Sequence, residues 1–426
     1  MLFRVVYSIE ARKMNIVREW NLEGMLPSHI PFGELSRTIQ KHAVAQRTFS
    51  LKSTNAVNYL SSVESYISKQ LISSQNYAEI KTLASQLTGN ITSFFGFETR
   101  LNSRDARSDY LFAVSKKKGE REALVNLLQN GTLPKIFSQK QEWQRIREFA
   151  KEWADPSSVL YNNICGLWFE FDIADSSSEI PVPGIFMQTK PLRIDTPEDI
   201  EKCTWITRIA MPLLIGQPIS ETLERRFLNC IEQLPEGASL FHVAVMLSRA
   251  SSAIRLVINR MRPDQIVPYL KSIGWSDNEN EGLSKLLEEL QDHTTRINLH
   301  VSIGDNIDPK IGLECNFSPD QYNMETKWSK FFDYLIEKGL CLPEKKSALL
   351  GFPGVEQEDI SHNFNLESYI TAVKISHNDF SKALVRYINH VKISYAPNHS
   401  LEAKAYPGVR LFGCPNESTT SVQSIM

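Results

Sequence analysis

The sequence predicts an α+β fold in which ten antiparallel strands close into one β-barrel and the helices lie outside it. Three observations predict this arrangement. Five pairs of short alternating strands recur along the 426 residues, and most pairs are followed by two amphipathic helical segments. The two strands of a pair are joined by a connection too short for a crossover helix, so they are antiparallel. Most strands carry their polar residues on one face.

The five strand pairs are the units of the barrel. Their alternation is clear at Trp168 and Glu170, which are interleaved with Phe169 and Phe171, as expected for a strand with one face on a core. The pairs are residues 97–102 with 110–115, 167–173 with 185–189, 242–248 with 254–261, 297–303 with 310–317, and 390–395 with 401–409. Closing ten strands removes two exposed edges and turns the polar faces into a shared lumen. The alternative is an open sheet whose polar face is covered by water.

Helical segments with apolar residues at three- and four-residue spacing separate the strand pairs. They are predicted at 120–129, 141–153, 196–211, 220–233, 264–273, 281–291, 324–338 and 343–350. Thr196 followed by Pro197 is a helix-start signal, and we expect that helix to end before Pro212. With the helical segments at 56–71 and 78–87, which precede the first strand pair, these units give five strand-pair and helix-pair repeats, and the last strand pair closes the ring.

The repeats also set the predicted domain boundaries. Residues 1–94 are predicted as a mainly helical extension packing on the barrel, residues 95–412 as the barrel domain, and residues 413–426 as a disordered tail rich in Ser and Thr. Within the extension, Val57, Leu60, Val63 and Ile67 follow helical spacing.

The composition excludes several classes of partner. Lys and Arg total 47 against 49 Asp and Glu, and the charges are interspersed, so neither a nucleic-acid surface nor a polybasic membrane patch is expected. No apolar run reaches the roughly 18 residues that span a bilayer. Six cysteines without CxxC spacing are typical of reduced thiols, which favours a cytoplasmic protein. Phosphate-binding loops, standard hydrolase motifs and the aspartate-rich DDxxD signature are missing.

The lumen face carries a set of basic residues. If the last turn is symmetric, Lys392 lies directly across from Lys404, and Ser394 lies across from Glu402. Two opposed ammonium groups repel each other, and an anion held between them makes the interaction attractive. Together with three more cations, they suit a phosphate or a diphosphate. Those cations are Arg100, Arg255 and Lys310. The alternative is that each cation pairs internally with a lumen carboxylate.

The same face offers acidic and aromatic groups. Glu98 is our first candidate for a general base and Glu170 our second, because a wall carboxylate can accept a proton as a substrate ring is alkylated. Trp168 and Tyr406 present aromatic faces that can stabilise a carbocation, although ordinary wall packing explains them equally well.

Three histidines share the lumen face on different strand pairs. His242, His300 and His390 lack a recognisable ligand spacing, so hydrogen-bonded polar histidines are favoured over a metal triad. We expect no metal site. His300 and Glu314 join the candidate substrate-binding residues.

A helix-jacketed barrel of this kind resembles the ABBA, or PT-barrel, fold of aromatic prenyltransferases over about residues 95–412. Lys404-Ala405-Tyr406 is similar to the Lys-x-Tyr strand pattern of the dimethylallyltryptophan synthase branch, although further Lys-x-Tyr strands are absent. The resemblance implies that lumenal Lys, Arg and Tyr residues hold the diphosphate of an allylic donor. It implies further that an acidic residue on an early strand, here Glu98 or Glu170, assists an aromatic acceptor.

The expected function is transfer of an allylic isoprenoid group from its diphosphate to an aromatic or peptide side-chain acceptor in specialised metabolism. No cofactor is expected, with Mg²⁺ as a diphosphate counter-ion the alternative. A second hypothesis is a non-catalytic barrel that binds a small anionic or peptidic ligand as a biosynthetic partner protein. Cations without carboxylate partners favour the enzyme, and neutralised cations favour the binding protein.

Overall fold

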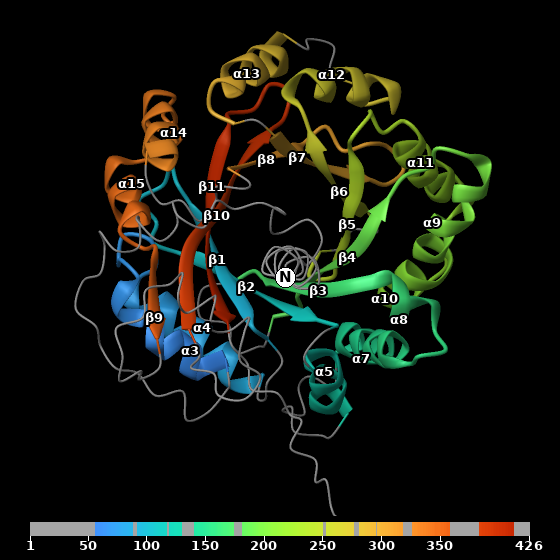
Figure 1. Ribbon diagram of the computed structural model, residues 1–426, viewed down its shortest axis with the longest axis horizontal. Coiled ribbons are helices and arrows are strands. Elements are labelled where there is room, and N and C mark those ends of the chain that lie inside the picture. The colour runs from blue at the N-terminus through green and yellow to red at the C-terminus, as the bar shows by residue number, and fades with distance from the viewer. Residues whose placement is uncertain are drawn as a thin grey trace, which may run out of the picture.

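The computed structural model describes residues 56–87, 92–116, 119–129, 140–173, 181–249, 253–276, 281–294, 296–317, 326–357 and 383–412. In these residues ten strands close into one antiparallel barrel, which Figure 1 shows end-on with the helices around it. The strands follow one another around the ring in chain order from β1 to β8, then β10 and β11, and β11 pairs with both β10 and β1. The predicted closed barrel of ten strands with helices outside is confirmed.

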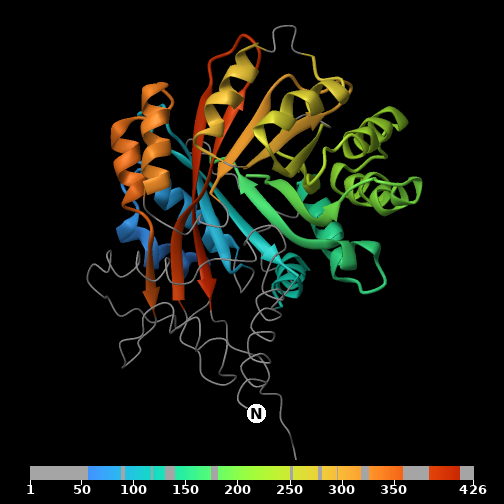
Figure 2. The ribbon, with the colours of Figure 1, turned by 45° about the horizontal axis from the view of Figure 1, so that its top comes forward.

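The strand bounds agree with the predicted pairs in position, and several strands are longer. The strands are β1 Phe94–Arg100, β2 Ser108–Ser115, β3 Ile164–Phe171, β4 Gly184–Leu192, β5 Ser239–Met246, β6 Ile254–Met261, β7 Arg296–Ile303, β8 Ile311–Asn316, β9 Gly354–Gln357, β10 Ala383–Tyr395 and β11 Glu402–Phe412. The short strand β9 has no counterpart in the sequence analysis. Figure 2 shows it alongside β10, with which it pairs through residues 383–386.

The helices cover the outside of the barrel (Figure 1). They are α3 Ala56–Val63, η1 Glu64–Tyr66, α4 Ser74–Gln86, α5 Glu120–Gln129, α7 Gln141–Ala154, α8 Val159–Asn163, η2 Pro197–Asp199, α9 Glu201–Trp205, η3 Ile206–Ala210, α10 Met211–Ile215, α11 Glu221–Glu232, α12 Pro263–Ser272, α13 Glu281–Gln291, α14 Thr326–Glu337 and α15 Pro343–Leu350. None of these described helices is long and apolar enough to cross a membrane.

The main core lies between the outer face of the barrel and the helices. Phe112 on β2 stacks on Phe169 on β3 at 4.9 Å, and Phe171 stacks on Trp143 of α7. Phe169 and Phe171 are at most 1% exposed, and burying one such side chain contributes roughly 1.5–3 kcal/mol. The alternation of the strands therefore turns the apolar residues outward, as predicted, and leaves the other face to the lumen.

The N-terminal helices pack against the first strand pair. The side-chain oxygen of Asn76 on α4 accepts a hydrogen bond from the backbone N–H of Ser108, at 2.9 Å, and the N–H of Ser73 donates to the carbonyl of Ala106. The barrel strands begin at Phe94 and end at Phe412. The predicted tail 413–426 and most of the predicted N-terminal extension lie outside the described residues.

The expectation that a helix ends before Pro212 is wrong. The chain continues from α9 through a π-helical turn, η3, into α10, which ends at Ile215 and is followed by Gly216 with a left-handed φ of 83°. The wider turn pairs the N–H of Met211 with the carbonyl of Ile206, five residues back. Because a π turn shifts the hydrogen-bond register, the missing N–H and the ring of Pro212 no longer break the helix.

An irregularity in β10 sets part of the lumen surface. The pairing of β10 with β11 shifts between Ile388 and His390, and Pro407, which has no N–H to donate, lies opposite Ile388. Ile388 packs in the outer core, whereas Tyr387 belongs to an apolar cluster inside the barrel. The bulge therefore lets Tyr387 and His390 share the lumen face although they are three residues apart.

Candidate functional site

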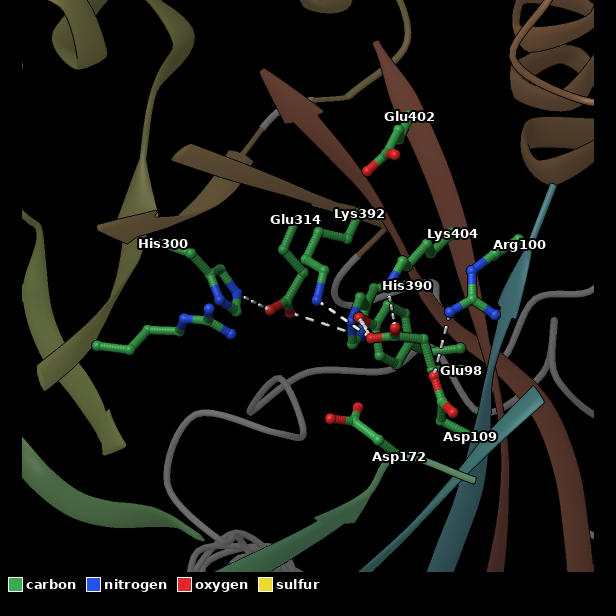
Figure 3. A network of polar contacts seen from close by, with 12 residues as sticks. Glu98, Arg100, Asp109, Asp172, His300, Glu314, His390, Lys392, Glu402 and Lys404 are labelled. Atoms are coloured by element: carbon green, nitrogen blue, oxygen red, sulfur yellow. Dashed lines mark hydrogen bonds and ion pairs between the residues drawn. The ribbon is translucent and has the colours of Figure 1, made fainter. Parts of the chain in front are cut away.

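The centre of the lumen holds a cluster around Glu98. This β1 carboxylate is 3% exposed and lies 3.3 Å from the Lys392 ammonium group. Lys404 Nζ and Tyr406 Oη also donate hydrogen bonds to it. Figure 3 shows Glu98, Lys392 and Lys404 converging from β1, β10 and β11. The barrel closure assembles the cluster, because β11 pairs with β1 on one side and with β10 on the other.

The charges of this cluster fix its protonation. Burial by itself raises the pKa of Glu98, but the ammonium groups of Lys392 and Lys404 and the hydrogen bonds from Lys404 and Tyr406 outweigh it, so the pKa lies well below its usual range. The same carboxylate raises the pKa of Lys404, against the effect of burial. Burial and the adjacent Glu98 raise the pKa of Tyr406 well above its usual value. Glu98 is therefore ionised near neutrality, and its three partners are donors.

A second cluster surrounds Glu314 on β8. Its carboxylate accepts a hydrogen bond from Asn298 at 2.8 Å and lies 3.0 Å from His300 Nε2 and 3.6 Å from His390 Nδ1. His390 also stacks on Tyr406, with ring centroids 4.0 Å apart, which joins this cluster to the first. The clusters thus form one polar network along β7, β8, β10, β11 and β1.

A glycine makes room inside this network. A Cβ on Gly312 would lie 3.1 Å from Cβ of His300 and 3.4 Å from Cδ of Lys392. A larger residue at this position would press on both side chains. Gly312 therefore allows the histidine and the lysine stem to meet beside Glu314.

The lumen histidines are uncharged near neutrality. Burial lowers the pKa of His242 to about 3 and the pKa of His390 to about 4, and it lowers the pKa of His300 well below the usual value. His300 must then donate from Nε2 to the Glu314 carboxylate, which only accepts.

Two other lumen carboxyl groups titrate close to neutrality. Burial, followed by the charge of Glu98, raises the pKa of Glu170 to about 7, while Lys392 and Arg255 partly offset the rise. The same two causes raise the pKa of Asp109 to about 6. Asp109 lies directly opposite Glu98 in the β1–β2 pairing. It was missed because the predicted strand begins at Tyr110, although Asp109 continues the same alternation.

The remaining predicted cations have other partners than Glu98, although Arg100 lies directly opposite Lys404 in the β1–β11 pairing. Arg100 and Lys310 have half-exposed side chains, paired with Asp109 at 3.9 Å and with Glu402 at 3.0 Å. Exposed pairs of this kind contribute little to stability, about 0–1 kcal/mol. Arg255, which is partly buried, contacts Ser302 Oγ at 3.4 Å and lies 4.0 Å from Met246 Sδ.

The lumen also has an apolar part, which is larger than the two aromatic residues expected from the sequence. Trp168 meets Phe94 edge-on at 4.7 Å between centroids, and Phe94 contacts Tyr387 at 6.0 Å. The buried members of this apolar cluster are Phe94, Leu111, Trp168, Phe186, Ala244, Met246, Val257, Val385, Tyr387 and Tyr406. Alternation alone places most of them on the lumen face, and Trp168 and Tyr406 are the two that were singled out from the sequence. The aromatic wall therefore borders the charged network directly, through Tyr406.

The structure places every predicted site residue on the lumen face or at its mouth. It brings Glu98, Lys392, Lys404 and Tyr406 into contact, and it pairs His300 with Glu314. Within the described ranges, no group of three or more His, Cys, Asp or Glu side chains is arranged to hold a metal ion.

No known protein-family model matches this chain, and no curated protein matches its sequence. Similar solved structures exist. Prenyltransferase PriB in its apo form is 11% identical, with 82% of this chain and 94% of that chain covered and a TM-score of 0.46. AnaPT from Neosartorya fischeri is 12% identical, with 89% and 97% covered and a TM-score of 0.45.

The structure of 5-dimethylallyl tryptophan synthase from Streptomyces coelicolor, in complex with DMASPP and Trp, is 9% identical, with 88% and 99% covered and a TM-score of 0.46. The fold of the chain resembles that of the ABBA prenyltransferases. The shared feature is the closed barrel of ten antiparallel strands with helices outside, and identities near 10% with TM-scores below 0.5 describe a distant likeness in the arrangement of elements.

Proposed function

We propose that the chain transfers an allylic isoprenoid group from its diphosphate to an aromatic or peptide side-chain acceptor in specialised metabolism. The proposal rests on three features that the barrel places in one lumen. Paired lysines, an aromatic wall and a carboxyl group with a pKa of about 7 all face the same lumen.

The diphosphate is assigned to Lys392 and Lys404. Each ammonium group has three N–H donors, and the contact with Glu98 uses one donor of each lysine. The remaining donors are available to oxygen atoms of a ligand, and charge-assisted hydrogen bonds of this kind are the stronger ones. Arg255 adds a guanidinium with donors beyond its contact to Ser302. In this role Glu98 orients the two ammonium groups.

The transfer step follows from the same arrangement. The C–O bond to the diphosphate breaks and leaves an allylic cation, which the faces of Trp168 and Tyr406 stabilise. A carbon of the acceptor ring forms the new C–C bond, and the ring then loses a proton to Glu170. A base works best when its pKa is near the operating pH, so we place Glu170 ahead of Glu98, the reverse of the order expected from the sequence.

The test is an assay for diphosphate release. The protein is incubated with dimethylallyl diphosphate and a mixture of indoles, phenols and short peptides, and products are identified by mass spectrometry. We expect release that depends on the acceptor, strongly reduced in the Lys392→Ala, Lys404→Ala double variant and retained in Lys310→Ala, whose side chain lies at the mouth. If no acceptor supports consumption of the donor, the transferase proposal fails.

A second candidate is the non-catalytic ligand-binding barrel. The observation favouring it is that four of the five predicted cations have a carboxylate partner: Lys392 and Lys404 share Glu98, Arg100 faces Asp109, and Lys310 faces Glu402. Thermal shift separates the two candidates. A ligand at about 100 times its Kd stabilises the fold by roughly 2.7 kcal/mol. Stabilisation by pyrophosphate without turnover of any donor would favour the binding protein.

A further inference from the structure

Glu314 has two directly opposite neighbours on the lumen face. Asn298 on β7 lies opposite it on one side, and Lys392 on β10 lies opposite it on the other. Opposed residues on one face of antiparallel strands have Cβ atoms about 4.5–5.5 Å apart, and opposite charges at that spacing attract each other. The register by itself therefore favours an ion pair between Glu314 and Lys392.

The structure does not contain this ion pair. Lys392 Nζ contacts Glu98 at 3.3 Å, and none of the hydrogen bonds or ion pairs among the described residues joins it to Glu314. Figure 3 shows Lys392 directed toward Glu98 and the Glu314 carboxylate directed toward His300. Glu314 therefore bonds to neutral groups although a lysine lies opposite it on the neighbouring strand.

Two side chains of β7 hold Glu314 in this orientation. Asn298 Nδ2 donates to one carboxylate oxygen at 2.8 Å, and His300 Nε2 donates to the other at 3.0 Å. His390 Nδ1 lies 3.6 Å from the first oxygen, which is beyond hydrogen-bonding distance. The Glu314 side chain is 15% exposed, so little water competes for its oxygens. Both oxygens are thus engaged by β7.

The space around Lys392 supports the same separation. A Cβ on Gly312 would lie 3.1 Å from Cβ of His300 and 3.4 Å from Cδ of Lys392, so a glycine lets the lysine stem pass beside the histidine without crowding. The nearby charge of Lys392 adds to burial in lowering the pKa of His300. His300 therefore stays neutral and donates to Glu314 from Nε2 as a neutral imidazole.

We propose that Asn298 and His300 are positioning residues for anion binding. By holding Glu314, they keep its carboxylate from pairing with Lys392, whose ammonium group then stays beside Glu98 with donors available to the diphosphate. This inference rests on the proposed function, and it names the residues that keep the lysine available to the ligand. Without them, Glu314 rotates toward Lys392 and competes with the ligand for the same donors.

The test is a double-mutant cycle on the binding of inorganic pyrophosphate, measured by isothermal titration calorimetry. Asn298→Leu frees one oxygen of Glu314 and should weaken binding about tenfold, as the loss of a hydrogen bond to a charged group does. Adding Glu314→Gln to that variant removes the competing charge and should restore binding. The gain in affinity from Glu314→Gln should be about tenfold larger in the Asn298→Leu background than in the wild type.

Two further variants make the cycle decisive. His300→Leu should show the same coupling to Glu314→Gln. Asn306→Leu, the same substitution at an exposed asparagine in the turn between β7 and β8, is the matched control and should bind pyrophosphate like the wild type. Residues that only support the fold would weaken binding equally whether or not Glu314 is replaced. Equal gains from Glu314→Gln in both backgrounds would therefore overturn the inference.

Crystal structures of the variants separate this inference from the proposed function. We expect Lys392 Nζ beside Glu314 in Asn298→Leu, and back beside Glu98 when Glu314→Gln is added. If Nζ stays on Glu98 in Asn298→Leu, the inference is wrong, whatever the protein does with an allylic diphosphate. Coupling in pyrophosphate binding, together with no consumption of any allylic donor, would retain the inference and remove the transferase.

Discussion

Lys392 on β10 lies directly opposite Lys404 on β11, and both ammonium groups contact the carboxylate of Glu98. Two opposed ammonium groups alone repel by an amount of roughly 0.2–1 kcal/mol. From the sequence we expected a bound anion to make this interaction attractive, and in the structure the carboxylate of Glu98 does so. A ligand anion must therefore use the ammonium donors that Glu98 leaves available.

The first prediction concerns the stability of this cluster. Glu98→Gln removes the charge shared by Lys392 and Lys404 and should destabilise the fold by about 3–5 kcal/mol, because breaking a buried ion pair leaves an uncompensated charge. Urea unfolding at pH 7 measures the change. The triple variant Glu98→Gln, Lys392→Met, Lys404→Met removes all three charges and should recover most of the loss. A single variant as stable as the wild type would show that the cluster is well hydrated.

The second prediction concerns anion binding. Lys404→Ala should weaken pyrophosphate binding by roughly 1.5–3 kcal/mol, or about 10- to 150-fold, the usual contribution of a hydrogen bond to a charged group. Calorimetry measures the Kd. Lys310→Ala is the control, since Lys310 pairs with Glu402 at the mouth and should change affinity little. Equal affinities for wild type and Lys404→Ala would falsify the assignment of the diphosphate to this pair.

The third prediction concerns the base. Glu170→Gln should lower turnover by about 10²–10⁴ with donor binding retained, because general-base assistance contributes that much. A base acts when ionised, so wild-type kcat should rise with pH through about 7, the pKa of Glu170, and then level off. The variant should lose this ascending limb. Asp172→Asn, a half-exposed neighbour that contacts Arg249, is the matched control. The same ascending limb in Glu170→Gln would assign the base elsewhere.

The fourth prediction concerns the pH dependence of stability. The pKa of His242 is about 3 in the fold, below its ordinary value near 6.5, so the neutral form is favoured by folding. The contribution of neutral His242 to the free energy of unfolding is present above pH 6.5 and is lost as the pH falls from 6.5 toward 3. Between pH 7 and pH 5.5 the loss is about 1 kcal/mol. His242→Leu should show a correspondingly smaller drop in the free energy of unfolding over that interval.

The difference between wild type and variant isolates His242, because Glu170 and Asp109 titrate in the same range with the opposite sign. Their raised pKa values favour the folded state as the pH falls. His399→Leu, at an exposed histidine, is the matched control and should follow the wild-type curve. Parallel curves for wild type and His242→Leu would contradict the buried, neutral assignment.

The architecture and the pairing of the last two strands could be predicted from the sequence. A period of two sorts each strand into an outward apolar face and a lumen face, and short connections force antiparallel pairing. The expected positions of Lys392 opposite Lys404 and of Ser394 opposite Glu402 are confirmed. The pairing within each strand pair depends on residues close in the chain, so local pattern and turn geometry are sufficient for it.

Tertiary structure alone decided which charges meet and how they titrate. Glu98 contacts Lys392 and Lys404 across 294 and 306 residues of chain, and only the closure of β11 onto β1 brings them together. The sequence by itself determined that acids, cations and histidines share one face. Whether a carboxyl group there is ionised, like Glu98, or half-protonated, like Glu170, depends on burial and on charges carried by several distant strands. The alternation of residues along a strand determines neither how deeply a carboxyl group is buried nor which charges surround it.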